Sequence, residues 1–297
     1  MLPIKTIPIL TIAILFVSSL HAVAKTEPDD VTIDHLSLSE QLYFLRVSSS
    51  RGNTTSVVYT DGLSTLLVDP NFNQSSEAIK QHLKLIKAGP IRYLTSSHDH
   101  RDHIEQYAKF SQDAMIIIPN SQAESVKEWG GLADITFHGE LTLNIGQNKV
   151  KLFTLPNKKG HTNGDLVAYF PDEKSLYVGD YYFASGFPII DIQSGDLNGY
   201  LANLAYLIDQ FSPTTQVIPG HTTFTPEPMR TITISDLDNY REGLISSIDW
   251  IMSQKNLGLT LEEIKSKGLP SEFDAYHDGL TFVKESKWIA YVYQQNQ

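Results

Sequence analysis

The segment from His98 to His103 constrains the fold of this chain more than any other. It holds three histidines and two aspartates in six positions, although the whole chain has only 10 histidines in 297 residues. In an extended segment residues two apart point the same way, so His98 and His100 can approach one ion. Asp102 and His103 fall where a helix begins and can face a neighbouring position. Imidazoles with a carboxylate are typical of zinc, whereas calcium and magnesium prefer oxygen ligands.

Apolar spacing around this motif predicts alternating strands and helices. A strand at 91–94 precedes the motif, and a helix at 104–110 follows it. Strand patterns also occur at 41–47, 56–60, 64–69, 114–118, 141–144, 149–155, 166–170, 175–178 and 215–218. Helical spacing occurs at 75–87, 121–129, 197–211 and from 235 onward, after a polar lead-in at 25–39. This order favours an α/β fold with two mixed β-sheets packed face to face between helices.

Further metal-ligand candidates stand at other strand ends. His161, Asp180 and His221 each directly follow a glycine near the end of a predicted strand. Rigid strands direct loop residues toward a common edge of a sheet, and glycine permits the tight turns and close backbone approach needed there. We therefore expect these three side chains to join the histidine-rich motif.

Together these residues resemble the metallo-β-lactamase superfamily. The family motif His-x-His-x-Asp-His stands at 98–103, and the later ligands fall in the family's order on His161, Asp180 and His221. Asp69 is similar to an early aspartate that supports the site in this family. The resemblance implies an αββα metallo-β-lactamase sandwich, with the site at one edge of the two sheets. The C-terminal portion also resembles exported members grouped near the class B β-lactamases.

The resemblance implies two divalent metal ions for each chain. The first ion would be bound by one set of residues, His98, His100 and His161. The second would be bound by another set, Asp102, His103 and His221, with Asp180 bridging the two. Zinc (Zn2+) is the usual occupant in the family, although related enzymes use Fe or Mn.

Two ions that share a carboxylate and a water lower the pKa of that water to about 7 and polarise a carbonyl oxygen. This chemistry predicts a metallo-hydrolase that cleaves an ester, thioester, lactone or amide bond in a small-molecule substrate. Asp102 is the catalytic candidate, because it can orient the attacking hydroxide or accept its proton. No Gly-x-Ser-x-Gly signature of a serine hydrolase occurs in the sequence.

Three alternatives remain open at this point. A class B β-lactamase is one, but the best-known subclasses place a cysteine in the second metal site and this chain has none. Asp180 instead resembles the bridging aspartate of glyoxalase II-type thioesterases and lactonases. The second alternative is a persulfide dioxygenase-like oxidoreductase with a single iron, and the third is a non-catalytic binding protein.

The N-terminus predicts export. Residues 1–24 combine a single charge at Lys5, an apolar run at 7–20 and the small-x-small sequence Ala22-Val23-Ala24, which is the layout of a secretory signal peptide. The apolar run is shorter than the roughly 20 residues needed to span a bilayer, so we expect no stable membrane insertion after cleavage. We expect residues 25–297 to form a single periplasmic or secreted domain with a helical C-terminal portion.

The net charge of −11 and the lack of a basic cluster argue against nucleic acid as a partner. The oligomeric state is left open by the sequence. Tyr181 and Tyr182 either line a pocket or pack against the sheet edge, and residues 183–190 form either a substrate wall or core. Asp99 and Arg101 are assigned only an orienting role. Other histidines lack partners at ligand spacing and read as surface or core residues: His35, His82, His138 and His277.

Overall fold

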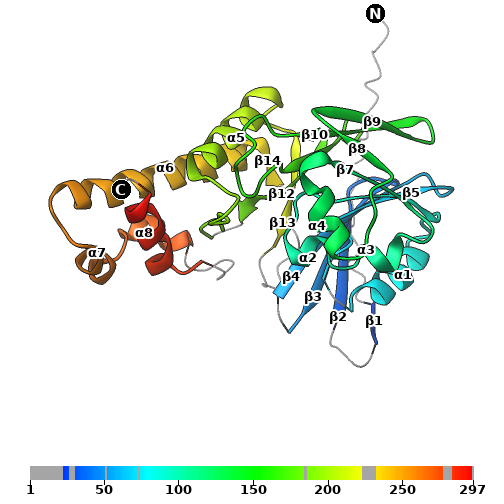
Figure 1. Ribbon diagram of the computed structural model, residues 1–297, viewed down its shortest axis with the longest axis horizontal. Helices are drawn as coiled ribbons and strands as arrows, with labels where there is room; N and C mark the ends of the chain where they lie inside the picture. The colour runs from blue at the N-terminus through cyan, green and yellow to red at the C-terminus, as the bar shows by residue number, and fades with distance from the viewer. Residues whose placement is uncertain are drawn as a thin grey trace, which may run out of the picture.

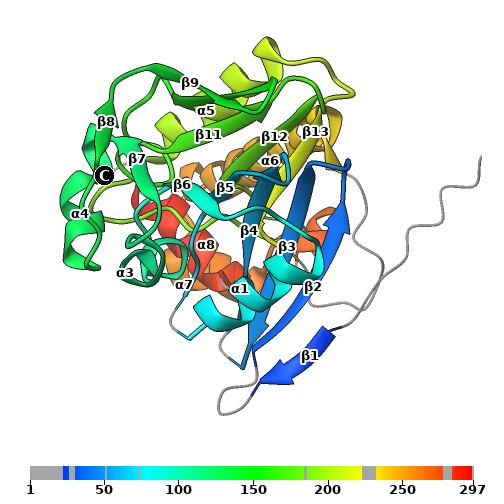
Figure 2. The same ribbon diagram turned by 90° about the vertical axis from the view of Figure 1, so that its right-hand side faces the viewer.

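The computed structural model describes residues 23–26, 31–50, 52–72, 74–183, 186–222, 232–276 and 283–295. Two mixed β-sheets pack face to face, and helices cover both outer faces (Figures 1 and 2). The expected αββα sandwich is therefore confirmed.

The first sheet has eight strands in sequence order: β1 (Val23–Thr26), β2 (Val31–Ser37), β3 (Leu42–Ser49), β4 (Gly52–Thr60), β5 (Thr65–Val68), β6 (Ile91–Thr95), β7 (Met115–Pro119) and β8 (Ile135–Phe137). Strands β1 to β5 pair antiparallel, and β5 to β8 pair parallel. The parallel half brings the carboxyl ends of β5 and β6 to one edge of the sheet, where the histidine-rich motif begins.

The second sheet has six strands, in the order β14 (Ile232–Thr233), β13 (Gln216–His221), β12 (Ser175–Phe183), β11 (Leu166–Phe170), β10 (Asn148–Thr154) and β9 (Glu140–Ile145). Only the β12–β13 pair is parallel among these described strands. These two strands therefore end side by side at the same edge of the sandwich.

Two groups of helices cover the sheets. The first sheet is covered by α1 (Ser76–Leu85), α2 (Arg101–Ile104), α3 (Tyr107–Phe110), η1 (Asn120–Gln122) and α4 (Ala123–Glu128). The second sheet is covered by α5 (Leu197–Gln210) and α6 (Ile234–Asn256), and three further elements pack against α6: α7 (Leu261–Lys267), η2 (Ser271–Tyr276) and α8 (Glu285–Gln294). Figure 1 shows α6, α7 and α8 extending to the left of the sandwich.

Alternating apolar residues in the central strands explain the layered core. In β4, Val57 belongs to the cluster between the sheets, whereas Val58 belongs to the cluster under α1 and α3. In β12, Tyr177 faces the other sheet, whereas Leu176 and Val178 face α5 and α6. Because residues alternate across a strand, a strand buried on both faces reads as a continuous apolar run. Each fully buried side chain of this size contributes about 1.5–3 kcal/mol to folding.

Local capping explains where the C-terminal helices begin. The side chain of Asp196 accepts the backbone N–H of Gly199 at the start of α5. Thr233 and Asp236 form a capping box at α6, and Thr260 and Glu263 form another at α7. Each cap satisfies backbone N–H groups that a helix start leaves without a partner.

Several predicted elements differ from the structure. The lead-in at 25–39 contains β2, whose buried Val31 and Ile33 alternate with the exposed Thr32, and β8 was not predicted. The helix predicted at 104–110 is two short helices, α2 and α3. The strand predicted at 175–178 continues to Phe183, so Asp180 lies inside β12 and not at its end.

Residues 1–22 of the predicted signal peptide lie outside the described residues, and its expected cleavage point falls within β1. Where the structure describes the chain, none of the helices has the length and apolar character required to cross a bilayer.

Candidate metal centre

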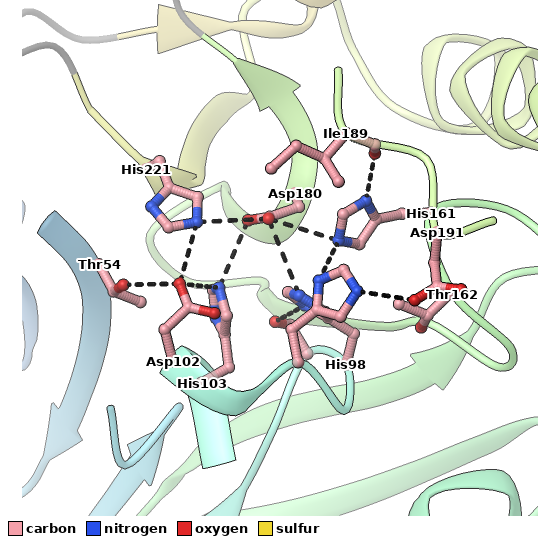
Figure 3. Close-up of polar contacts among 12 residues, drawn as sticks. Thr54, His98, Asp102, His103, His161, Thr162, Asp180, Ile189, Asp191 and His221 are labelled. Atoms are coloured by element: carbon pink, nitrogen blue, oxygen red, sulfur yellow. Dashed lines mark hydrogen bonds and ion pairs between the residues drawn. The ribbon is translucent and has the colours of Figure 1, made fainter. Parts of the chain in front are cut away.

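The structure brings together all seven side chains that the sequence indicated as metal ligands. Figure 3 shows Asp180 among His98, His103, His161 and His221. They come from separate elements at the edge where both sheets end. His98 and His100 follow β6, while Asp102 and His103 lie in the first turn of α2. The loop between β10 and β11 contains His161. Asp180 lies in β12, and His221 lies at the end of β13.

These side chains form two groups in which the potential ligand atoms lie within 4.8 Å of one another. One group is His98, His100, His161 and Asp180; the other is Asp102, His103 and His221. Asp180 also reaches the second group. Its Oδ2 lies 3.4 Å from Nε2 of His161 and 3.3 Å from Nε2 of His221. Its Oδ1 lies 3.6 Å from Nε2 of His103. The carboxylate of Asp180 thus lies between the two groups.

Backbone carbonyls orient two of the histidines. Nδ1 of His161 lies 2.7 Å from the carbonyl oxygen of Ile189, and Nδ1 of His221 lies 2.5 Å from that of Asn53. A carbonyl oxygen can only accept a hydrogen bond, so each Nδ1 must carry the hydrogen. In the neutral ring, Nε2 then presents a lone pair to the centre of the site.

Asp69 sets the tautomers of two more histidines. Its carboxylate accepts from Nδ1 of His103 at 2.6 Å and from the hydroxyl of Ser97 at 2.7 Å. Because the Ser97 hydroxyl donates to Asp69, its oxygen accepts from Nδ1 of His98, 3.0 Å away. Both Nε2 atoms therefore face the site. The supporting role that the resemblance implied for Asp69 agrees with these contacts.

His100 has the opposite ring orientation. Its Nε2 points to Oδ2 of Asp191 at 3.4 Å, and its Nδ1 lies 3.0 Å from Nε2 of His161. Nε2 of His100 and Nδ1 of His161 both face acceptors, so each of these nitrogens carries a hydrogen. The lone pairs of Nδ1 of His100 and Nε2 of His161 are therefore directed at each other. This arrangement is unfavourable unless a cation or a proton lies between them.

Buried polar atoms without partners test whether the site fits a metal. Within the described residues, Nε2 of His98, Nε2 of His103 and Oδ1 of Asp180 are buried and have no hydrogen-bond partner. Each such atom costs about 1–3 kcal/mol. A divalent cation would satisfy all three, and nitrogen with carboxylate oxygen is a donor set that suits zinc, iron or manganese. The residues therefore fit the metal that the resemblance implied.

The electrostatics differ between the two groups of ligand candidates. Burial alone would lower the pKa of His103, but the carboxylates of Asp102, Asp69 and Asp180 raise this pKa to about 10. For His161 burial prevails, and neighbouring rings add to it, so its pKa falls to about 3. A metal ion would therefore displace a proton from His103 and meet a His161 that is already neutral.

Two glycines allow the strands to approach closely enough. A β-carbon on Gly220 would overlap Oδ1 of Asp180. Gly179 has a positive φ of 53°, and a β-carbon there would lie 2.7 Å from the side chain of Ser97. The pairing of β12 with β13 shifts register at this point, which turns Asp180 toward the histidines.

Tyr181 packs inside the protein. Its hydroxyl donates to Asp165 at 2.7 Å and accepts from the amide of Asn203 at 2.9 Å, and its ring stacks on Tyr200. Tyr182 is also buried and packs against α6. Residues 183 and 186–190 belong largely to the same core, while Ala184 and Ser185 lie outside the described residues. The core interpretation of this segment is therefore the right one.

Sequence spacing did not indicate several supporting residues. Asp165 accepts the backbone N–H of His161 at 3.0 Å, and Thr54 donates to Asp102 at 3.0 Å. Asp191 follows an apolar run with no ligand-like spacing. Only the position of Asp165, four residues after a ligand candidate and next to a glycine, offered a signal.

The remaining histidines lie outside this site where they are described. His35 and His82 contact each other at 3.1 Å between β2 and α1, and His138 contacts Asn120 at 2.8 Å. His277 lies outside the described residues. Asp99 accepts from Ser125, and Arg101 pairs with the nearby Glu105.

Comparison of the sequence with known proteins gives partial matches. No family model matches the chain. The hydroxyacylglutathione hydrolase of Bartonella henselae is 27% identical over 129 residues, which is 43% of this chain and 46% of the relative. The protein of the same name from Brucella ovis is 33% identical over 96 residues, or 32% of this chain and 35% of the relative. The chain thus spans less than half the length of these curated relatives.

Comparison of the structure gives broader matches. A metallo-β-lactamase from Pontibacter korlensis superposes with a TM-score of 0.59 at 17% identity, covering 71% of this chain and 97% of its own. The BLEG-1 B3 metallo-β-lactamase superposes with a TM-score of 0.53 at 22% identity, covering 66% and 96%. The chain has the metallo-β-lactamase fold, and the curated relatives that it matches in part are hydrolases by name.

Proposed function

We propose that the protein is a metal-dependent hydrolase whose site holds two divalent ions. The position of Asp180 carries this proposal, because its carboxylate lies within 3.3–3.8 Å of ring nitrogens from both groups of ligand candidates. Its side chain is buried, so its negative charge has to be balanced inside the protein.

One ion would be held by His98, His100 and His161. The other would be held by Asp102, His103 and His221, and both ions would be held by Asp180. When bound, such ions lower the pKa of a coordinated water to about 7 and polarise a carbonyl oxygen. We propose zinc as the occupant, since nitrogen-rich sites with carboxylates suit it.

Asp102 would act on the proton of the attacking water. Its side chain is 40% exposed, while those of His103 and Asp180 are 0% and 2% exposed, so Asp102 can meet a substrate. Burial raises the pKa of Asp102, but the neighbouring rings of His103 and His221 lower it by more. The net lowering keeps the carboxylate ionised as a proton acceptor. The hydroxyl of Thr54 holds one carboxylate oxygen in place.

We propose a thioester as the preferred substrate, with esters, lactones and amides as related classes. The relatives named hydroxyacylglutathione hydrolases support this choice, as does the bridging aspartate in a chain without cysteine. Water would add to the carbonyl carbon, the C–S bond would break, and the proton taken by Asp102 would pass to the departing thiolate.

β-Lactam hydrolysis is a second candidate, favoured by the similarity of the fold to solved metallo-β-lactamases. The same attack on a carbonyl carbon would open the lactam ring. One iron ion for each chain together with oxygen consumption would contradict both candidates, because these are the properties of a single-iron dioxygenase.

The test combines metal analysis with a substrate panel. The purified protein would be assayed for bound metal and for hydrolysis of a hydroxyacylglutathione thioester, a homoserine lactone, nitrocefin and a phosphodiester. We expect two zinc ions for each chain and the fastest turnover of the thioester. Replacement of His98 or Asp102 by Ala should lower turnover at least about 100-fold. His138→Ala, which changes an exposed histidine, is the matched control. Near-normal turnover in metal-free protein would overturn the proposal.

We also propose that the protein is exported. The signal-like segment at 1–24 supports this. Expression of the full chain in a Gram-negative host should give a periplasmic protein that begins at Lys25. An uncleaved protein in the cytoplasm would contradict the proposal.

A further inference from the structure

The loop that precedes α5 contacts two of the metal-ligand candidates. The carbonyl oxygen of Ile189 lies 2.7 Å from Nδ1 of His161 (Figure 3), and Oδ2 of Asp191 lies 3.4 Å from Nε2 of His100. A carbonyl is part of the backbone at every position, but the carboxylate depends on the residue type. Asp191 is therefore the part of this loop that substitution can test.

The loop itself fixes the carboxylate of Asp191. Its Oδ1 accepts the backbone N–H groups of Gln193 at 2.7 Å and Ser194 at 2.9 Å. Its own N–H donates to the carbonyl oxygen of His161 at 3.1 Å. These bonds hold Oδ2 toward His100 without help from the ring.

His100 needs such a partner more than the other histidines do. Its side chain is 24% exposed and that of Asp191 is 31% exposed, whereas the side chains of His98 and His103 are 1% and 0% exposed. Close packing restricts the rings of the buried histidines. The ring of His100 is less restricted, so a hydrogen bond has to select its orientation.

The chemistry of the carboxylate also selects a tautomer. An ionised carboxylate only accepts, so it favours the form of His100 that carries its hydrogen on Nε2. The lone pair is then on Nδ1, which faces His161. The opposite tautomer would point an N–H bond at the place where the ion should bind.

We infer that Asp191 is a positioning residue that selects the Nε2–H tautomer of His100 and thereby sets the affinity of the site for the ion that His100 binds. The inference rests on the proposed function, since it assumes that His100 is a metal ligand. It assigns to Asp191 no contact with substrate or with the ion.

Asp191→Asn is the sharpest variant. The amide oxygen can keep the turn by accepting from Gln193 and Ser194, which leaves the NH2 group facing Nε2 of His100. That group donates, so it favours the wrong tautomer. We expect the affinity for one of two zinc ions to fall about 10–100-fold in competition with a chromophoric chelator, while the other is unchanged. Asp191→Ser keeps an acceptor for the turn, but its side chain is too short to reach His100. This variant should bind the same zinc ion more weakly.

Asp196→Asn is the matched control. It makes the same change five positions later in the chain, where the side chain caps α5 by accepting from Gly199. Asn caps helices as well as Asp does, so the control should bind both ions with wild-type affinity. Circular dichroism would show that each variant is folded.

A second measurement tests the tautomer without metal. Ring nitrogen chemical shifts of the metal-free protein, assigned with a His100→Gln variant, should show hydrogen on Nε2 of His100 in the wild type and a shift toward Nδ1 in Asp191→Asn. An unchanged tautomer, or wild-type affinity for both ions in Asp191→Asn, would overturn the inference. A wild-type protein that binds no zinc would overturn the proposed function instead, and the tautomer measurement would still decide the role of Asp191.

Discussion

The carboxylate of Asp69 lies 2.6 Å from Nδ1 of His103, and neither side chain is exposed to solvent. The same carboxylate also accepts from the hydroxyl of Tyr177 at 2.5 Å and from the backbone N–H of Ser97 at 2.6 Å. Because four donors surround it, Asp69 stays an acceptor, and His103 must turn its Nε2 to the site. Asp69, which directly follows β5, thus orients His103 from outside the motif that contains it.

Asp69→Asn should therefore weaken metal binding without removing a ligand. The asparagine side chain has an NH2 group in place of one carboxylate oxygen. This group donates, so at least one of the four contacts with a donor becomes repulsive. We expect the affinity for zinc to fall about 10–100-fold, measured by chelator competition. Asp34→Asn, which changes a partly exposed carboxylate paired with Arg46 in β3, is the matched control and should bind zinc like the wild type. Equal zinc affinity in both variants would contradict the role of Asp69.

Gly220→Ala should displace Asp180. The added β-carbon would overlap Oδ1 of Asp180, which lies in β12 beside β13. We expect loss of at least one of two bound zinc ions and a fall in turnover of about 100-fold or more. Metal content after dialysis would check this. Gly258→Ala controls for glycine replacement as such, because a β-carbon there has no atom within 4 Å despite a positive φ of 89°. Wild-type metal content in Gly220→Ala would count against a shared carboxylate.

The sequence indicated the layers and the seven ligand candidates because both depend on local patterns. Runs such as Leu66 and Leu67 mark strands buried on both faces, and a ligand candidate that directly follows a glycine recurs at His161, Asp180 and His221. The contact of Asp191 with His100 joins residues 91 positions apart through an irregular loop, and no periodic pattern records it. The same holds for Thr54 and Asp102, which belong to different elements. Supporting contacts follow from the three-dimensional packing and could not be read from spacing.

Tyr181→Phe separates a packing role from a catalytic one. Loss of the hydroxyl leaves the buried amide of Asn203 and the carboxylate of Asp165 each without one partner. We expect the free energy of unfolding to fall by about 1–3 kcal/mol, measured by urea denaturation. Turnover in the folded variant should stay within a few-fold of wild type. A fall of about 100-fold in turnover with unchanged stability would instead indicate a hydrogen bond to the developing oxyanion.

His82→Gln should change how stability depends on pH. Burial lowers the pKa of His82 to about 4, the nearby His35 lowers it too, and Asp34 opposes both. Since the unfolded pKa is near 6.5, the unfolded state binds more protons between pH 6.5 and 4. The stability that neutral His82 provides is therefore complete above pH 6.5 and is lost as the pH falls toward 4.

The lowering of the pKa of His82 from 6.5 to about 4 corresponds to about 3 kcal/mol of stability. The measurement is the free energy of unfolding of the metal-free protein at several pH values. The wild type should lose more stability than His82→Gln on acidification, because glutamine does not titrate. His138→Gln makes the same change at an exposed histidine and should follow the wild type. Because the histidines of the metal centre titrate alike in all three proteins, their contribution cancels in the comparison. Parallel curves for wild type and His82→Gln would show that burial does not hold His82 neutral.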